Sequence, residues 1–352
     1  MASLNLAQIR TIVVAGGAGF VGSHVVDDLL EHCPQARIRI LDACTYAADL
    51  SRLDAAFRTG RVTFSQGDVG NLELVTDLVR DADLVVNAAG ESHVDRAIAA
   101  PERFSLANAV GPQMLVEAVA RRKVPLMIHV SSAEVYGTAE DGVGEGRALS
   151  PDNPLGASKA AAEMLIGGLR DLYGVDIRIL RPGNLAGSRQ NTEKLLPRFI
   201  ELASVGRPLP VHGDGMQRRS FLSVADFCSA LRTVVARGAP NATYNVGGAA
   251  SHSVLDIARL VLDAVPEPVA GVAFIDPRPI ERSRPVLSTA ALEALGWTAR
   301  DTLATLFPAL VAFYTGRIPG GARRRLRNVP DLAPQVVVQP AGSGLFRSLE
   351  RH

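Results

Sequence analysis

The chain has 352 residues, 47% of them hydrophobic and 21% charged, which suits a globular protein with one large domain or two modest ones. A formal net charge of +1 gives no broad positive field and argues against nucleic acid or a membrane surface as a partner. The three cysteines lack metal-ligand spacing, and their odd number argues against a disulfide framework. That cysteine pattern predicts no metal site. No apolar run reaches membrane-spanning length, so we expect a cytoplasmic protein.

The first predicted element is a hydrophobic strand at Thr11–Ala15 that leads into a glycine-spaced turn and a helix. Gly16 allows the sharp turn, Gly19 lets the backbone approach a pyrophosphate, and Gly22 lets the helix pack on the strand. The first N–H groups of the helix are free to bind phosphate. The spacing alone is a weak signal, and a glycine-rich turn without a ligand is the alternative.

A second apolar strand at Arg37–Leu41 ends in Asp42, about twenty residues after the glycine loop. A carboxylate at this place accepts hydrogen bonds from both hydroxyls of the adenosine ribose and repels a 2′-phosphate. The pattern therefore predicts NAD rather than NADP, with a solvated aspartate as the alternative.

Further short apolar runs recur along the chain, separated by segments of helical period such as 72–80 and 107–121. These runs are Val62–Phe64, Leu84–Asn87, Leu126–Val130 and Asp176–Leu180. The alternation predicts an α/β fold, a Rossmann-like doubly wound parallel sheet with helices on both faces. Ser23, Asn71 and Ser158 are predicted to begin helices because each can act as a cap.

Asp68 and Val69 follow the third predicted strand, at the edge of the sheet where ligands collect. Asp68 is predicted to hold the adenine amino group. A turn aspartate without a ligand explains the same spacing equally well.

After Pro182 the alternation breaks down and glycine- and proline-rich connections appear, which predicts a second, smaller lobe. We assign residues 1–182 to a dinucleotide-binding domain, with 225–246 packing back on it. The smaller lobe takes 183–224 and 247–315. Residues 316–352 lack a sustained pattern and are predicted to form a loosely ordered tail, whose arginine run is either solvated or bound to an anionic partner.

Six motifs between Thr11 and Trp297 resemble those of the extended short-chain dehydrogenases/reductases, and among them the nucleotide-sugar 4,6-dehydratases and epimerases typified by dTDP-glucose 4,6-dehydratase. The motifs are Gly-Gly-Ala-Gly-Phe-Val-Gly-Ser at 16–23, Thr-Tyr-Ala at 45–47, Glu-Ser-His-Val-Asp-Arg at 91–96, Ser-Ser-Ala-Glu-Val-Tyr-Gly at 131–137, Glu-Lys-Leu-Leu-Pro at 193–197 and Leu-Gly-Trp at 295–297. In that family the sugar is oxidised at C4 by NAD, loses water across C5 and C6, and takes the hydride back at C6.

The resemblance implies a UDP- or dTDP-hexose as substrate, bound by the smaller lobe, and a homodimer formed through the helices at 107–121 and 157–173. It assigns NAD contacts to Gly16, Gly19, Phe20, Val21, Gly22, Asp42, Thr45, Asp68, Val69, Ala89 and Lys159. It assigns substrate contacts to Ser92, Asn108, Asn184, Lys194, Leu195, Pro210, Arg219, Asn245, Arg282 and Arg284. For the lone arginines, surface ion pairs are the alternative.

Three residues match the catalytic positions of the family, namely Ser132, Glu134 and Lys159. Glu134 matches the residue that takes the C5 proton, and Lys159 matches a cation near the C4 hydroxyl. Leu155 stands four residues before Lys159, where the family has the tyrosine that acts as general base. Ala133 stands where an aspartic acid protonates the leaving 6-hydroxyl. Each such loss costs about 10²- to 10⁴-fold in rate.

Candidate replacements for these groups are Tyr136, His93, Glu91 and Asp95, or a water held by Ser132 and Lys159. For two of them a structural role is favoured: His93 is expected in the wall of the cofactor site, and Tyr136 is expected to pack beneath the strand end. The first hypothesis is therefore an NAD-dependent nucleotide-sugar enzyme with a changed acid/base set, which dehydrates or epimerises its substrate. The second is a non-catalytic homologue that binds NAD and a sugar nucleotide. The third is a plain oxidoreductase that releases NADH.

Overall fold

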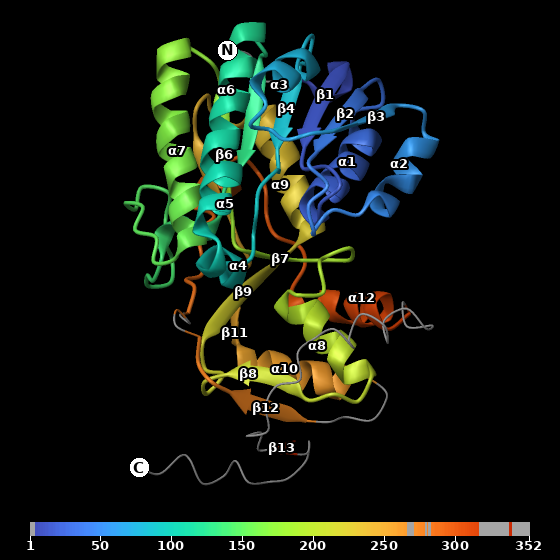
Figure 1. Ribbon diagram of the computed structural model, residues 1–352, viewed down its shortest axis with the longest axis vertical. Helices are drawn as coiled ribbons and strands as arrows, with labels where there is room; N and C mark the ends of the chain where they lie inside the picture. The colour runs from blue at the N-terminus through green and yellow to red at the C-terminus, as the bar shows by residue number, and fades with distance from the viewer. Residues whose placement is uncertain (1–3, 266–270, 279, 281–282, 317–337, 340–352) are drawn as a thin grey trace. The chain divides into compact units, whose positions relative to one another are not determined.

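The computed structural model describes residues 4–265, 271–278, 280, 283–316 and 338–339 (Figure 1). The chain forms two compact units. The first contains Met1–Arg189, Ser220–Ala250 and Arg284–Thr302, and the second contains Gln190–Arg219, Ser251–Ser283 and Leu303–His352. The predicted division instead placed residues 183–189, 220–224, 247–250 and 284–302 in the smaller lobe. The pairing of β7 (Asn184–Ala186) with β9 (Arg218–Ser223) accounts for part of this difference, because it joins residues 184–186 to 221–223 within the first unit.

The first unit is built on a seven-stranded sheet in the order β10-β6-β5-β4-β1-β2-β3, and its strands pair in parallel. The strands are β1 (Thr11–Ala15), β2 (Arg37–Asp42), β3 (Val62–Gln66), β4 (Leu84–Asn87), β5 (Leu126–Val130), β6 (Ile177–Pro182) and β10 (Thr243–Val246). The predicted parallel α/β sheet is confirmed. The order reverses between β1 and β4, and the carboxyl ends of strands at such a point form the usual ligand crevice.

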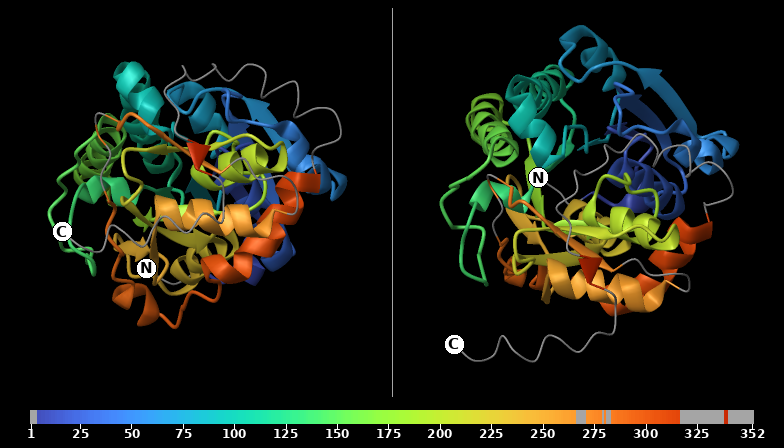
Figure 2. Two further views of the ribbon diagram at one scale, coloured as in Figure 1. Left: turned by 90° about the horizontal axis from the view of Figure 1, so that it is seen from below. Right: turned by 60° about the horizontal axis from the view of Figure 1, so that its bottom comes forward.

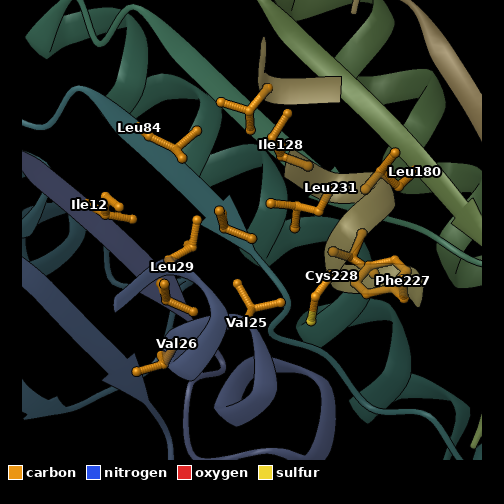
Figure 3. Packing of buried hydrophobic residues seen from close by; sticks show 14 of the residues in the cluster. Ile12, Val25, Val26, Leu29, Leu84, Ile128, Leu180, Phe227, Cys228 and Leu231 are labelled. Carbon is orange, nitrogen blue, oxygen red and sulfur yellow. The ribbon is translucent and has the colours of Figure 1, made fainter. Parts of the chain in front are cut away.

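Alternate side chains of each strand pack on opposite faces of this sheet. On one face Ile12 and Val14 of β1 join the buried residues of α1 (Phe20–His32) and α9 (Val224–Arg237), as Figure 3 shows for part of the cluster. On the other face Val13 joins α3 (Leu72–Leu78) and two longer helices, α6 and α7. Both faces are therefore covered, as the continuous apolar runs predicted.

The helices α6 (Gly111–Arg122) and α7 (Pro154–Tyr173) lie side by side along this second face (Figure 1, Figure 2). A π-helical turn, Leu106–Val110, leads directly into α6. The remaining helices of the unit are α2 (Asp54–Arg58), α4 (Val94–Ala99), α5 (Pro101–Ser105) and α11 (Ala290–Glu293).

Two predicted helix starts were wrong. The helix α1 begins before Ser23, whose hydroxyl donates to the Phe20 carbonyl oxygen at 3.1 Å instead of capping. The helix α7 begins at Pro154, and its cap is Asn153, because the hydroxyl of Ser158 donates to the Leu155 carbonyl at 2.8 Å. Serine hydroxyls inside a helix commonly bond back to the preceding turn in this way. The third prediction is confirmed, since Asn71 caps α3.

The second unit contains a small sheet in which β12 (Val272–Ile275) pairs in parallel with β8 (Leu209–His212) and antiparallel with β13 (Val338–Gln339). Its helices are α8 (Leu195–Ser204), α10 (Val254–Ala264) and α12 (Leu303–Gly316), and α8 packs against the other two; the strand β11 spans Ser251–Ser253. Apart from Gly316 and β13, the predicted tail lies outside the described residues. Within the part of the chain described, no helix is both long and apolar enough to cross a membrane.

Candidate functional site

The glycine loop between β1 and α1 is a tightly packed cradle that tolerates no side chain at two positions. Gly16 has a φ of +79°, and a Cβ there would lie 2.6 Å from the nitrogen of Ala89. A Cβ on Gly22 would lie 2.0 Å from the carbonyl oxygen of Gly16. The N-cap of α1 is Gly19, which has no side chain to occupy the first N–H groups of the helix. The cradle therefore fits a pyrophosphate held at the helix N-terminus.

Replacing Gly22 with alanine is expected to abolish NAD binding and to lower the free energy of unfolding. The added methyl group would meet backbone, which cannot move aside without opening the loop. Gly144→Ala is the matched control, because no atom lies within 4 Å of its Cβ position. Calorimetric titration with NAD and chemical denaturation of both variants measure the two effects. Normal NAD affinity in Gly22→Ala would contradict the assignment of the cradle.

Asp42 lies at the end of β2 and joins the glycine loop to the next segment. Its carboxylate accepts from the N–H groups of Ala18 at 3.0 Å and Cys44 at 2.9 Å. Burial raises its pKa, while these backbone donors act in the opposite direction. A carboxylate has about four acceptor positions, so these bonds leave acceptor capacity for ribose hydroxyls. Thr45, the next predicted contact, is exposed.

Other predicted NAD contacts surround this loop. Phe20 packs edge-on against the ring of His24, with centroids 5.4 Å apart. Asp68 accepts from the N–H of Gly70 at 2.7 Å, which is the turn that the alternative interpretation described, and it is exposed. Val69 is buried, whereas Val21 is partly buried. A structural turn and an adenine contact are compatible at Asp68, because one carboxylate oxygen makes the turn bond.

Asn108 lies below the loop that follows β4, where it organises the backbone. Its Oδ1 accepts from the N–H of Glu91 at 2.9 Å, and its Nδ2 donates to the Glu91 carbonyl and to the hydroxyl of Ser158, each at 3.0 Å. The side chain is fully buried. We therefore correct its predicted role from a substrate contact to a support, because its hydrogen-bonding groups are engaged within the protein. Ser92, by contrast, is exposed.

Lys159 is buried on α7 beside the same loop. Its Nζ donates to the Val130 carbonyl at the end of β5 at 3.2 Å, and a Cβ on Gly90 would lie 3.1 Å from it. Burial lowers the pKa of Lys159 to about 8, with the charge of Glu163 acting in the opposite direction. The site therefore holds an amine that titrates close to neutral pH.

Glu134 lies two residues after Ser132, in the short 3-10 helix Ala133–Tyr136 at the end of β5. The hydroxyl oxygen of Ser132 accepts from the N–H of Glu134 at 3.2 Å and caps this turn. A Cβ on Gly156 would lie 2.5 Å from the Glu134 carbonyl oxygen. The absence of a side chain at Gly156 thus lets α7, which carries Lys159, approach the turn that carries Glu134.

The carboxylate of Glu134 is held by Arg284 and Asn153. The Nε of Arg284 donates to Oε1 at 3.0 Å, its Nη2 lies 2.8 Å from Oε2, and Asn153 Nδ2 donates to Oε2 at 2.7 Å. The remaining nitrogen of Arg284, Nη1, donates to Asp152 at 2.9 Å. Burial alone would raise the pKa of Asp152, but Arg284 together with the hydrogen bonds from Thr138 and Asn153 outweighs it, and the net shift is downward.

Leu155 and Ala133, at the two positions that depart from the family pattern, lie in apolar surroundings. Leu155 is buried with Ala97 and Phe104. Ala133 is buried in a cluster that includes Leu287. Neither a leucine nor an alanine side chain can donate or accept a proton, so these two positions do not perform the family's acid/base steps.

Tyr136 and Asn245 belong to a buried polar network under the end of the sheet. The hydroxyl of Tyr136 donates to Asn245 Oδ1 at 2.8 Å and accepts from Arg181 at 2.6 Å. Arg181 also pairs with Glu163 at 2.6 Å. The burial of Tyr136 agrees with the expectation that it packs beneath the strand end rather than acting as a replacement base. Asn245, whose Nδ2 donates to the Val143 carbonyl at 2.9 Å, is fully buried, which corrects its predicted role as a substrate contact.

The other predicted substrate contacts are distributed over both units. Asn184 of the first unit donates to the Ser220 carbonyl at 3.2 Å. The second unit contains Lys194, which is the N-cap of α8, then Leu195, Pro210 and Arg219. Arg282 lies outside the described residues. Sequence reasoning missed Asp152 and Asn153, although the Asn-Pro pair at 153–154 is a standard signal for a capped helix start.

Comparison with known proteins identifies the family of the chain. The pattern of the NAD dependent epimerase/dehydratase family matches residues 12–247. The low-salt glycan biosynthesis protein Agl12 of Haloferax volcanii is 37% identical over 306 residues, 87% of this chain and 98% of that protein. The dTDP-glucose 4,6-dehydratase of Streptomyces antibioticus is 34% identical over 347 residues, 95% of this chain and 99% of that protein.

Among solved structures, DesIV, a dTDP-glucose 4,6-dehydratase from Streptomyces venezuelae determined with NAD and TYD bound, aligns with a TM-score of 0.85. The two chains are 32% identical, and the alignment covers 88% of this chain and 98% of DesIV. The glycine cradle and Asp42 agree with NAD as the cofactor. The protein therefore belongs to the NAD dependent epimerase/dehydratase family, within the extended short-chain dehydrogenases/reductases.

Proposed function

We propose that the protein is an NAD-dependent nucleotide-sugar enzyme that oxidises a UDP- or dTDP-hexose at C4 and then acts at C5 and C6 with a changed acid/base set. The observation that carries the proposal is the placement of Glu134 and Lys159 at the carboxyl end of β5, in the same sheet as β1, which leads into the cofactor cradle; only β4 lies between the two strands. The two dTDP-glucose 4,6-dehydratases from Streptomyces that the chain resembles support this substrate class.

Bound NAD would supply the acceptor for the C4 hydride. Removal of the C4 hydroxyl proton then needs a base in place of the tyrosine absent at Leu155. We assign this step to Lys159, since its neutral form is accessible near pH 8 and its Nζ lies at the strand end. Glu134 takes the C5 proton, which the C4 ketone makes acidic. Ser132 remains a proposed catalytic residue that orders this turn.

Epimerisation is the second candidate function, and the residue at position 133 favours it. Loss of the 6-hydroxyl as water requires a proton donor, and the methyl side chain of Ala133 cannot supply one. Without that donor, a carbanion formed at C5 is more readily reprotonated than converted to an alkene. A product inverted at C5, rather than a 6-deoxy sugar, would follow.

Incubation of the purified protein with NAD and with UDP-glucose or dTDP-glucose in D₂O tests the proposal. A 4-keto-6-deoxy sugar identifies a dehydratase, and a C5 epimer carrying deuterium identifies an epimerase. Absence of both products, with both ligands bound in calorimetry, would overturn the proposal in favour of a non-catalytic binding homologue. A stoichiometric release of NADH would support the plain oxidoreductase.

A homodimer remains part of the proposal, and exposed apolar side chains support it. Leu106 precedes α6, and Met164, Leu172 and Tyr173 lie on α7; all are large and exposed. A second copy of the chain covering these helices would remove them from water. A cytoplasmic location, like the absence of nucleic-acid and membrane partners, stays a prediction from the sequence.

A further inference from the structure

We propose that Arg284, anchored by Asp152, is a positioning residue that orients the carboxylate of Glu134 for removal of the C5 proton. The inference rests on the proposed function and assigns Arg284 a role different from the ribose or phosphate contact that the family resemblance implied. It starts from an arrangement of the first unit in which two carboxylates share one guanidinium group.

The contacts of Arg284 hold Glu134 in one orientation. Two nitrogens of the guanidinium reach the two oxygens of the carboxylate, Nε to Oε1 at 3.0 Å and Nη2 to Oε2 at 2.8 Å. Such a bidentate pair fixes the plane of the carboxylate as well as its position. The side chain of Arg284 is only 8% exposed and that of Glu134 only 16%, so solvent weakens the pair little.

Counting donors identifies the oxygen that accepts the proton. Oε2 accepts from both Asn153 and Arg284, whereas Oε1 accepts only from Arg284 among the hydrogen bonds of this cluster. Each carboxylate oxygen has two lone pairs. Oε1 therefore keeps one lone pair for the substrate. When the C5–H bond breaks, the proton forms an O–H bond at Oε1, and the electron pair left on C5 is delocalised into the C4 ketone as an enolate.

Asp152 keeps Arg284 in place when Glu134 is protonated. Once Glu134 has taken the proton it is neutral and attracts Arg284 less strongly. Asp152 continues to bind Nη1 of Arg284 at 2.9 Å, and it is itself held by the hydroxyl of Thr138 at 2.9 Å. Arg284 therefore keeps its place while Glu134 carries the proton, and the carboxylate is ready in the same orientation after the proton has left.

The test separates C4 oxidation from C5 proton removal in the NAD-loaded protein with UDP-glucose and dTDP-glucose. Bound NADH, measured at 340 nm, reports oxidation, and deuterium at C5 reports proton removal. In Arg284→Met we expect C5 exchange to fall about 10²-fold, the typical effect of a misplaced catalytic group, while NADH still forms and accumulates. Arg284→Lys restores part of the exchange because it keeps the charge but loses the bidentate fork. Asp152→Asn lowers exchange less than Arg284→Met does.

A double-mutant cycle decides whether Arg284 acts through Glu134. In the Glu134→Gln background, Arg284→Met should cause no further loss of C5 exchange. Arg80→Met, which breaks an exposed pair with Asp77, is the matched control and should change neither reading. Equal loss of NADH formation and C5 exchange in Arg284→Met, or a further loss in the Glu134→Gln background, would overturn the inference. A wild-type protein that gives neither NADH nor exchange would instead overturn the proposed function.

Discussion

Replacing Lys159 with methionine is expected to slow C4 oxidation by about 10²- to 10⁴-fold, the range for loss of a positioned base. Methionine keeps the apolar length of the side chain and removes the amine next to Gly90. Stopped-flow measurement of NADH formation after mixing with the nucleotide sugar gives the rate. Lys123→Met, at the exposed C-cap of α6, is the matched control and should leave the rate unchanged.

The pH dependence of the C4 oxidation rate provides a second test of the role of Lys159. Its pKa of about 8 in the folded protein lies below the ordinary value of 10.5, so the amine loses its proton as pH rises through 8. Because the neutral amine accepts the C4 proton, the wild-type rate should rise with pH across this range and then level off. Lys159→Met should show no such rise. A wild-type rate that is flat between pH 7 and 9 would contradict the assignment.

The same shift predicts the direction of the effect on stability. Between pH 8 and pH 10.5 the unfolded chain binds a proton at Lys159 that the folded protein has released. The contribution of Lys159 to the free energy of unfolding therefore increases with pH across that window. Below pH 8 the folded protein holds a buried charge, so Lys159→Met should be at least as stable as the wild type there. Chemical denaturation at two pH values measures both effects.

Replacing Glu134 with glutamine is expected to stop the reaction after the first step. C5 deuterium incorporation should fall by about 10²- to 10⁴-fold, whereas NADH should form and remain bound. An amide is too weak a base to take the C5 proton, but it occupies the volume of the carboxylate between Arg284 and Asn153. NMR of the product mixture in D₂O and absorbance at 340 nm separate the two steps.

Glu140→Gln provides the control for this substitution, since Glu140 is an exposed glutamate a few residues further along the chain. It should retain both NADH formation and C5 exchange. If Glu134→Gln exchanged deuterium at C5 as fast as the wild type, another group would have to remove that proton. The proposal that Lys159 takes the C4 hydroxyl proton and Glu134 takes the C5 proton would then be wrong.

Local patterns sufficed for the sheet and the cofactor cradle. The runs at Thr11–Ala15, Leu84–Asn87 and Leu126–Val130 match β1, β4 and β5 to the residue, because a strand buried on both faces is apolar along its whole length. The roles of Gly16 and Gly22 also follow from short-range spacing. Each would clash with backbone if it carried a side chain.

The hydrogen-bond partners of Glu134 could not be predicted from local sequence patterns. Arg284 is 150 positions from Glu134 and 132 from Asp152 in the chain, and only the folded backbone brings them together. The hydroxyl of Tyr136 likewise meets Asn245 across 109 positions. An isolated arginine or tyrosine in a sequence does not indicate its partner, so motif position alone assigned Arg284 to the substrate, and Asn245 could not be predicted as the partner of Tyr136.

The side chain of Asn153 links the start of α7 to the carboxylate of Glu134 by two hydrogen bonds. Its Oδ1 accepts from the N–H of Gly156 at 2.9 Å, and its Nδ2 donates to Glu134 at 2.7 Å. Fraying of the first turn of α7 therefore frees Asn153 and weakens its bond to Glu134, while the two bonds from Arg284 still hold the carboxylate. The amide proton of Gly156 becomes a natural reporter, since its exchange with solvent measures how often Asn153 leaves its place beside Glu134.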